Sequence, residues 1–408
     1  MIWEIEIAKN GEPTLKLNGN YIYSKYEPFK DAEKWTISEI SADYNTYCLI
    51  GVGLGYHLKA LVTHTKFEQI YVYYFDENEL NAFKNVQTDD WWKVDRISFV
   101  KNIDSINFSS TTHLLIPNAF VNALEETYPL KNLLETIKIN IRTYNKLADT
   151  LNDNFYKNIK LNDKSISFGN CIGQSKLACL VSAGPTLDET INWLIEYQSY
   201  VDIYVVGAAL RKVAEAGIKP TAVITSDAKE ETLAQFENVN YAGHLYYLST
   251  ANHSVVNQHQ GKRTILFQNE FPLAEQYAHK NKAPLLDTGG SVATITFSLL
   301  EFLGYRKVIL FGQDVGFTGQ NTHAKGSTSN KSIMKEKRLL KKIKANNGEM
   351  IYTTIMLYTF WQWFKEKFKE TKCEVYNTAL QGAYIPGTKY IDKAKFEMLI
   401  KEESNEIG

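Results

Sequence analysis

Several residues that could do chemistry follow one short apolar segment near the middle of the chain. The stretch LVSAGPTLDE ends this segment on Gly184, Pro185 and Thr186. Glycine lets another group approach the backbone closely, and Thr186 with Glu189 three residues later predicts a capping box at the start of a helix. Free N–H groups and the positive end of such a helix favour an anion, most simply a phosphate.

A second helix start of the same kind is predicted in DTGGSVAT, with Thr288, Gly289, Gly290 and Ser291 before an apolar helix. Neither segment contains the Gly-Lys-Ser/Thr sequence of a P-loop. Phosphate binding without that lysine points away from P-loop nucleotide hydrolysis. An activated donor whose phosphate leaves is the more natural ligand.

Acid and base candidates follow other apolar segments. Gln313 and Asp314 come directly after KVILFG, His323 lies in the polar stretch beyond them, and Asp227 follows AVITS. A carboxylate or a neutral imidazole can remove a proton from an attacking hydroxyl. The sequence leaves Asp314 and His323 as alternatives for this base, and equally allows a helix-capping carboxylate and a surface-loop histidine.

The elements that would position these residues alternate between strand and helix from Lys176 to about Gly316. The predicted strands are short apolar runs without alternation, as expected for parallel strands covered on both faces: LACLVSA, DIYVVG, AVITSD, HLYYLST, TILFQN and KVILFG. Carboxyl ends of parallel strands share one edge, where ligands bind. Gly207 and Asn252, which follow the second and fourth strands, therefore join the predicted groove.

An earlier part of the chain has a second strand–turn–helix pattern. A strand at Thr46–Ile50 leads into Gly51-x-Gly53-x-Gly55, and a later strand ends at Asp76-Glu77. This order is typical of a Rossmann-type site for a nucleotide or a methyl donor. A purely structural glycine turn explains it equally well, so ligand binding there stays open.

These patterns predict an α/β protein with two Rossmann-like parallel-sheet domains and a smaller, mostly helical C-terminal region. The predicted divisions are 1–165 with linker helices, 166–330 as the catalytic domain, and 331–408. A chain of 408 residues exceeds one ordinary core. The polar, basic stretch 320–344 predicts a mobile loop that could act as a lid beside His323.

Composition excludes several classes of function. A net charge of −1 gives no electrostatic case for nucleic acid or an anionic membrane. Four scattered cysteines without a CxxC pair favour a reducing compartment over a disulfide framework or zinc ribbon. No apolar run approaches the ~18 residues of a membrane span, and the N-terminus lacks a signal-peptide pattern. We therefore expect a cytoplasmic protein.

The ordered motifs LVSAGPTLD, GAALRKVAEAGIKPTAVITSDA, DTGGSVAT and KVILFGQDVGFTGQNTHAKG together resemble the motility-associated factor (Maf) flagellin glycosyltransferases. The pieces NGNYIYSKYEPFKDAEKW and LIGVGLGYHL are similar to the first domain of that family. The resemblance implies a central domain similar to bacterial sialyltransferases. It also implies transfer of a nonulosonic acid of the pseudaminic or legionaminic type from a CMP-linked donor to Ser or Thr of flagellin.

The resemblance implies functional roles for the residues of this sequence that match the family's motifs. Gly184, Pro185 and Thr186 match the turn that would hold CMP, and the segment from Thr288 to Ser291 matches the second glycine motif. Asp227 matches the acid after the third strand, and Gln313, Asp314 and His323 match the QD…H segment. The tail departs from the family pattern, since Leu380 and Gln381 stand where an acid and a glycine are expected.

Three other functions remain alternatives. A 6-hydroxymethylpterin diphosphokinase-like enzyme would use ATP and Mg²⁺, with Asp227 and Asp314 as metal ligands. A non-catalytic flagellin-binding factor would keep the fold without the reaction, and a methyltransferase would use the Gly51–Gly55 turn. No cofactor is required by the transferase hypothesis beyond its CMP-sugar, although Mg²⁺ is possible, and Lys325 is a candidate to steady the leaving phosphate.

Overall fold

The computed structural model describes residues 1–42, 44–102, 112–168, 177–318, 323–325 and 340–406. The chain divides into two compact units, Met1–Arg142 and Thr143–Gly408. Each unit contains a parallel sheet with helices packed against it, which confirms the predicted α/β class. Among the described residues, no helix combines the length and apolarity that crossing a membrane requires.

The first unit holds two sheets. Its antiparallel sheet is β1-β2-β3, and its parallel sheet has the order β6-β5-β4-β7. The strands are β1 (Trp3–Ile7), β2 (Pro13–Leu17), β3 (Asn20–Tyr21), β4 (Thr46–Ile50), β5 (Gln69–Tyr73), β6 (Ile97–Val100) and β7 (Thr112–Leu115). The helices are α1 (Pro28–Glu39), α2 (Tyr56–His64), α3 (Glu77–Val86), the short 3₁₀ turn η1 (Asp90–Trp92) and α4 (Asn118–Ala123).

One long helix, α5 (Lys131–Ile159), takes the place of the linker helices predicted within residues 1–165. It begins in the first unit and ends in the second. No proline and no glycine interrupts it, so nothing in the backbone stops the helix before Ile159.

The second unit is built on a nine-stranded sheet of order β13-β12-β11-β10-β9-β8-β14-β17-β18, in which every recorded pairing is parallel. All six central strands predicted from the sequence are confirmed. The strands are β8 (Ala178–Val181), β9 (Asp202–Val206), β10 (Ala222–Thr225), β11 (Leu245–Leu248), β12 (Arg263–Gln268), β13 (Leu285–Leu286), β14 (Lys307–Phe311), β17 (Glu374–Asn377) and β18 (Thr388–Tyr390).

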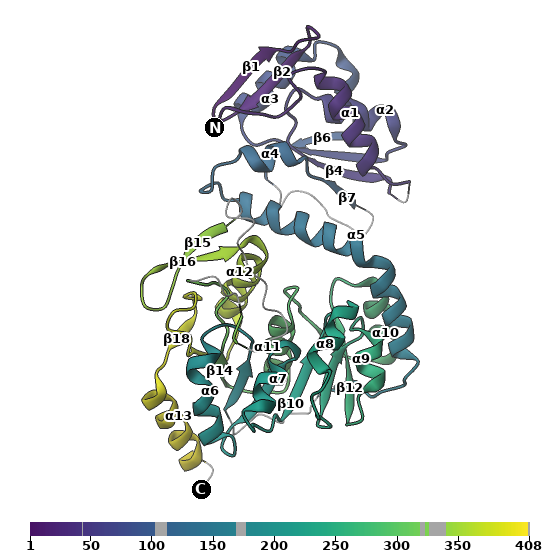
Figure 1. The fold of residues 1–408 in the computed structure, drawn as a ribbon. Helices are drawn as coiled ribbons and strands as arrows, with labels where there is room; N and C mark the ends of the chain where they lie inside the picture. The colour runs from purple at the N-terminus through teal and green to yellow at the C-terminus, as the bar shows by residue number, and fades with distance from the viewer. Residues whose placement is uncertain (43, 103–111, 169–176, 319–322, 326–339, 407–408) are drawn as a thin grey trace. The chain divides into compact units, whose positions relative to one another are not determined.

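Helices pack on both faces of this sheet (Figure 1), which explains why strands such as β8 and β10 are buried along their whole length. They are α6 (Leu187–Tyr197), α7 (Gly207–Glu215), the 3₁₀ turn η3 (Glu230–Thr232), α8 (Leu233–Phe236), α9 (His253–Gln258), α10 (Pro272–Asn281), α11 (Val292–Phe302), α12 (Ile355–Glu370) and α13 (Lys393–Glu406). A hairpin of β15 (Leu340–Lys344) and β16 (Met350–Thr354) precedes α12.

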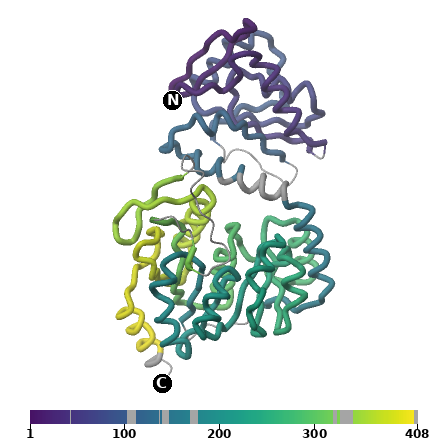
Figure 2. Tube along the Cα trace, in the orientation of Figure 1, coloured from purple at the N-terminus to yellow at the C-terminus, as the bar shows by residue number. Residues whose placement is uncertain are grey.

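The observed divisions differ from the predicted ones. Contacts separate the chain after Arg142 rather than after residue 165. The region 331–408 adds β17 and β18 to the central sheet beside β14, so its strands share one core with the preceding domain. The last helix packs beside α6, since the ring centroid of Phe396 lies 6.0 Å from that of Trp193 and 5.9 Å from that of Tyr197. In the trace of Figure 2 the yellow C-terminal end lies next to the teal part of the second unit.

The predicted lid falls largely on residues 319–322 and 326–339, which lie outside the described residues. The end of that polar stretch forms strand β15. Cys48, Cys179 and Cys373 are free thiols.

Candidate functional site

The order of the central sheet creates a switch point between β8 and β14. The chain moves from β8 outward through β9 to β13, and then returns to β14 on the other side of β8. In open parallel sheets the crevice outside the strand ends at such a reversal is the usual ligand site. Two predicted groups, Gly184–Thr186 after β8 and Gln313–Asp314 after β14, follow the two strands that meet there.

Hydrogen bonds join these two groups directly. Ser182 donates from Oγ to Gln313 Oε1 at 2.6 Å, and Thr186 donates from Oγ1 to Asp314 Oδ2 at 2.9 Å. The Thr186 N–H donates to Asp314 Oδ1 at 3.3 Å, and the Gly184 N–H donates to the Gly312 carbonyl at 2.8 Å. The structure therefore brings together residues that lie about 130 positions apart in the sequence.

Gly184 is required here because of Asp314. A Cβ at position 184 would overlap Asp314 Oδ2 and the carbonyl oxygen of Gly312. The close approach predicted from the glycine is thus confirmed, but the approaching group is a side chain of the protein.

The predicted capping box at α6 is wrong. Thr186 makes no side-chain cap, because its hydroxyl donates to Asp314, and the Glu189 N–H bonds the Thr186 carbonyl. The N–H groups of Leu187 and Asp188 also bond backbone carbonyls of the turn. A phosphate at this helix start would therefore meet amides that are already engaged.

Asp314 has the electrostatic environment of a proton acceptor. Its side chain is buried, with 5% of the residue exposed, and burial raises its pKa to about 7. The two hydrogen bonds from Thr186 oppose this shift, while the negative charges of Glu189 and Asp188 add to it. A carboxyl group balanced between its two protonation states near neutral pH suits general base catalysis.

The segment containing His323 lies beside the end of β8. The Ala324 N–H donates to the Ala183 carbonyl at 2.8 Å, and the Lys325 N–H donates to Asp188 Oδ2 at 3.1 Å. Burial lowers the pKa of His323 below its ordinary value, which keeps the imidazole neutral near pH 7. Asp188 also forms an ion pair with Lys212 of α7, which no sequence motif predicts.

The second predicted helix start is confirmed, with a capping box between Ser291 and Thr294 at the beginning of α11. Gly289 is packed so closely that a Cβ would overlap the ring of Trp363 in α12. Right-handed crossovers place α6 on one face of the sheet and α11, which returns across it, on the other. The two starts therefore do not form one phosphate-binding pair on a single face.

The remaining predicted residues lie further along the sheet. Gly207 is the buried first residue of α7 after β9. Asn252 is buried and caps α9 by accepting from the Val255 N–H, while Asp227 is exposed and its carboxylate accepts from the Lys229 N–H. The Asn252 N–H donates to the Asp227 carbonyl at 2.9 Å, so these two loops form one group.

The distance along the sheet matters for the proposed metal site. Asp227 follows β10 and Asp314 follows β14, with β9 and β8 between them. The Asp314 carboxylate lies over Gly184 after β8, so two strand spacings, roughly 10 Å, separate it from the end of β10, which does not favour one ion bound by both carboxylates. Among the described residues, no group of three or more His, Cys, Asp or Glu is arranged to hold a metal.

The glycine turn of the first unit is filled by the protein itself. The Glu79 carboxylate accepts from the Gly53 N–H at 2.8 Å and from the Phe75 N–H at 2.6 Å, and burial raises its pKa to about 8. A Cβ at Gly51 would overlap the ring of Phe120.

The acid predicted for a ribose, Asp76, is also engaged, because it caps α3 and accepts from Trp3 Nε1 at 2.9 Å. The turn and the acid are where the sequence predicts them, and their polar groups bond other residues of the same unit. This supports the structural interpretation of the glycine turn over a bound nucleotide or methyl donor.

One family model and one solved structure are similar to this chain. A family model described as 6-hydroxymethylpterin diphosphokinase MptE-like matches residues 152–320. A solved structure, that of a MAf glycosyltransferase from Magnetospirillum magneticum AMB-1, is similar over 98% of this chain and 73% of that chain. The TM-score is 0.54 and the sequence identity is 14%. The chain has the fold of a Maf glycosyltransferase.

No curated protein matches the chain. The MptE-like match covers β8 to β14, the part of the sheet that contains the switch point. The Maf glycosyltransferase fold extends over both units, including the first unit that the MptE-like match leaves out.

Proposed function

We propose that this protein is a glycosyltransferase that moves a nonulosonic acid of the pseudaminic or legionaminic type from a CMP-linked donor to Ser or Thr hydroxyls of flagellin in the cytoplasm. The observation that carries this proposal is the likeness to a Maf glycosyltransferase over 98% of the chain. The buried carboxyl group of Asp314 at the switch point supports it, since the reaction needs a proton acceptor there.

The chemistry assigns a simple task to Asp314. The acceptor hydroxyl gives its proton to the carboxylate, and its oxygen forms a bond to the anomeric carbon with inversion. The bond from that carbon to the phosphate oxygen breaks, and CMP leaves with the electron pair. Thr186 orients the carboxylate through two hydrogen bonds, one from its hydroxyl and one from its amide.

His323 is the alternative base, because its imidazole is kept neutral and its segment is fixed beside the end of β8. Lys325, an exposed residue two positions later, would approach the departing phosphate. The two bases differ in one measurable property. Burial raises the pKa of Asp314 and lowers that of His323.

The test is transfer itself. Purified protein is incubated with flagellin and a CMP-nonulosonic acid, and the intact mass of flagellin is measured for wild type, Asp314→Asn and His323→Ala. Asp202→Asn is the matched control, because Asp202 is a carboxylate at the opposite, amino end of the same sheet, where it accepts from the Tyr305 hydroxyl. Mass addition by wild type and by the control, with loss in one base variant, supports the proposal.

A diphosphokinase is the second candidate, and the MptE-like match to residues 152–320 favours it. The separation of Asp227 from Asp314 speaks against their sharing one Mg²⁺ ion. Incubation with ATP, Mg²⁺ and 6-hydroxymethylpterin, followed by detection of AMP, tests this function directly. AMP formation without any mass addition to flagellin would overturn the transferase, and CMP failing to bind while flagellin binds would favour a non-catalytic factor.

A further inference from the structure

Two asparagines of α5 donate hydrogen bonds to the loops that follow β10 and β11. Asn154 and Asn158 are four residues apart, which places them on one side of the helix. Their exposed fractions are 6% and 0%. Burying an amide side chain costs free energy unless its polar atoms form hydrogen bonds. The hydrogen-bond partners of the two asparagines therefore identify the segments that α5 holds in place.

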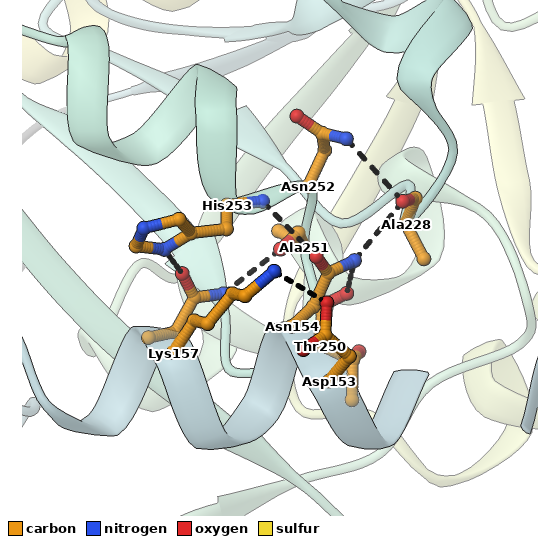
Figure 3. Close-up of polar contacts among 9 residues, drawn as sticks. Asp153, Asn154, Lys157, Ala228, Thr250, Ala251, Asn252 and His253 are labelled. Carbon is orange, nitrogen blue, oxygen red and sulfur yellow. Dashed lines mark hydrogen bonds and ion pairs between the residues drawn. The ribbon is translucent and has the colours of Figure 1, made fainter. Parts of the chain in front are cut away.

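Asn154 connects both loops. Its Nδ2 donates to the Ala228 carbonyl at 3.0 Å and to the Thr250 carbonyl at 3.3 Å (Figure 3). Its Oδ1 accepts from the His253 N–H at 3.3 Å. One side chain thus fixes the polypeptide after β10 relative to that after β11.

Asn158 holds the second loop at three points. Its Nδ2 donates to the Ser249 carbonyl at 3.0 Å and to the Ala251 carbonyl at 2.8 Å, while its Oδ1 lies 2.9 Å from His253 Nδ1. Because the amide nitrogen faces two carbonyls, the oxygen faces the imidazole and can only accept. His253 Nδ1 therefore carries the proton in this arrangement.

The loops held in this way carry Asp227. Ala228, which accepts from Asn154, is the next residue in the chain, and the Asp227 carbonyl accepts from the Asn252 N–H at 2.9 Å. The Asp227 side chain is exposed at the carboxyl edge of the sheet. The bond from Asn154 to Ala228 holds the loop of Asp227 directly. The other five bonds of Asn154 and Asn158 hold the loop after β11, whose Asn252 N–H bonds the Asp227 carbonyl.

We propose that Asn154 and Asn158 are positioning residues that hold the Asp227 carboxylate where it accepts hydrogen bonds from hydroxyl groups of the sugar-nucleotide donor. An ionised carboxylate only accepts, and its two oxygens suit neighbouring hydroxyls such as those of a ribose or a sugar. The Asp314 carboxylate over Gly184 is two strand spacings, roughly 10 Å, from the end of β10, a separation within the length of an extended sugar nucleotide. This inference rests on the proposed function, with the reaction at Asp314 and donor recognition at Asp227.

The test uses full-length protein and a matched pair of substitutions at neighbouring helical positions. Asn158→Asp keeps the shape of the side chain but turns an acceptor toward the Ser249 and Ala251 carbonyls. Asp153→Asn is the control, since Asp153 is exposed and pairs with Lys157 rather than with the loops. The expected result is a KM for the CMP-sugar raised about tenfold by Asn158→Asp, with kcat and its pH profile unchanged, and no change in the control.

A merely structural role is separated by a double-mutant cycle. Asp227→Asn should raise the same KM, and combining it with Asn158→Asp should add little, because both changes remove one interaction. His253→Ala, which removes only the contact to Asn158 Oδ1 among the side-chain bonds, serves if Asn158→Asp fails to fold.

Each outcome separates the two proposals. Additive effects, an unchanged KM, or a fall in kcat alone would overturn the positioning role while leaving the transferase in place. A wild-type protein that neither transfers the sugar nor binds CMP by calorimetry would overturn the proposed function itself, and the positioning role with it.

Discussion

The two units each place a buried carboxyl group over a glycine turn, and the comparison shows how one local pattern takes two different uses. In the first unit Glu79 accepts two backbone N–H groups, and it lies only 26 residues from Gly53. In the second unit Asp314 accepts a hydroxyl and an N–H group from Thr186, 128 residues away. The first carboxyl closes its turn, whereas the second lies at the switch point of a large sheet.

A strand, a glycine turn and a helix in sequence are therefore not sufficient evidence of a ligand site. Side chains of Tyr23, Phe83 and Phe120 fill the space beside the first turn, so that a Cβ on any of its three glycines would overlap one of them. At the second turn the group over Gly184 is the Asp314 carboxyl, which lies where β8 and β14 meet at the switch point of the sheet.

Substitution of the two carboxyl groups, Asp314 and Glu79, should have very different effects on kcat. Asp314→Asn should lower kcat by about 10²- to 10³-fold, because the amide cannot accept the acceptor proton. Glu79→Gln should leave kcat near the wild-type value. Initial rates of sugar transfer to flagellin, normalised to folded protein, measure both, and equal losses in the two variants would remove the distinction.

Alanine substitution at Gly53 and at Gly184 should lower the stability of both units, but the activity in only one case. Gly53→Ala adds a Cβ that overlaps the Tyr23 hydroxyl, and it forces alanine into the left-handed backbone conformation of Gly53, whose φ is +54°. Together these effects should destabilise the first unit by about 2–3 kcal/mol. Gly184→Ala should cost about 1–3 kcal/mol and also displace the Asp314 carboxylate. Urea unfolding followed with transfer assays should show lost activity per folded molecule only for Gly184→Ala.

The pH dependence of the reaction should identify the base. If Asp314 is the base, kcat/KM should rise about fivefold between pH 6 and pH 7, with a midpoint near its pKa of about 7. If His323 is the base, the midpoint should fall below the ordinary histidine value, because burial lowers its pKa. A profile of Asp314→Asn with the same midpoint as wild type would exclude Asp314.

The smallest effect concerns the stability of the first unit. Because burial raises the Glu79 pKa to about 8, the folded state binds this proton more tightly than the unfolded state. The resulting stability is fully present below the unfolded pKa and is lost as pH rises through about 8. Glu79→Gln should flatten this dependence and cost about 1–2 kcal/mol through one poorly paired N–H group; thermal unfolding between pH 5 and 9 measures it.

Much of the fold could be predicted from local patterns. The apolar runs at β8 to β12 and at β14 specify strands buried on both faces, and Ser291 marks the start of α11. The extent of the second domain could not be predicted, because β17 and β18 reach β14 only after the hairpin and α12. The hydrogen bonds of Asn154 and Asn158 to the loops after β10 and β11 could not be predicted either, since two asparagines four residues apart are common on solvated helices.

Local sequence is enough to predict the parallel strands, their polar carboxyl ends and the residue types at the candidate site, because burial and helix starts depend on neighbours within a few positions. Which of those residues meet depends on the tertiary structure. Strand order placed Asp314 beside Thr186 and kept Asp227 three strands away, and packing filled the turn at Gly53 with Glu79. Such contacts depend on which strands become neighbours and which side chains fill the remaining space, and both are set by the whole core rather than by any one segment.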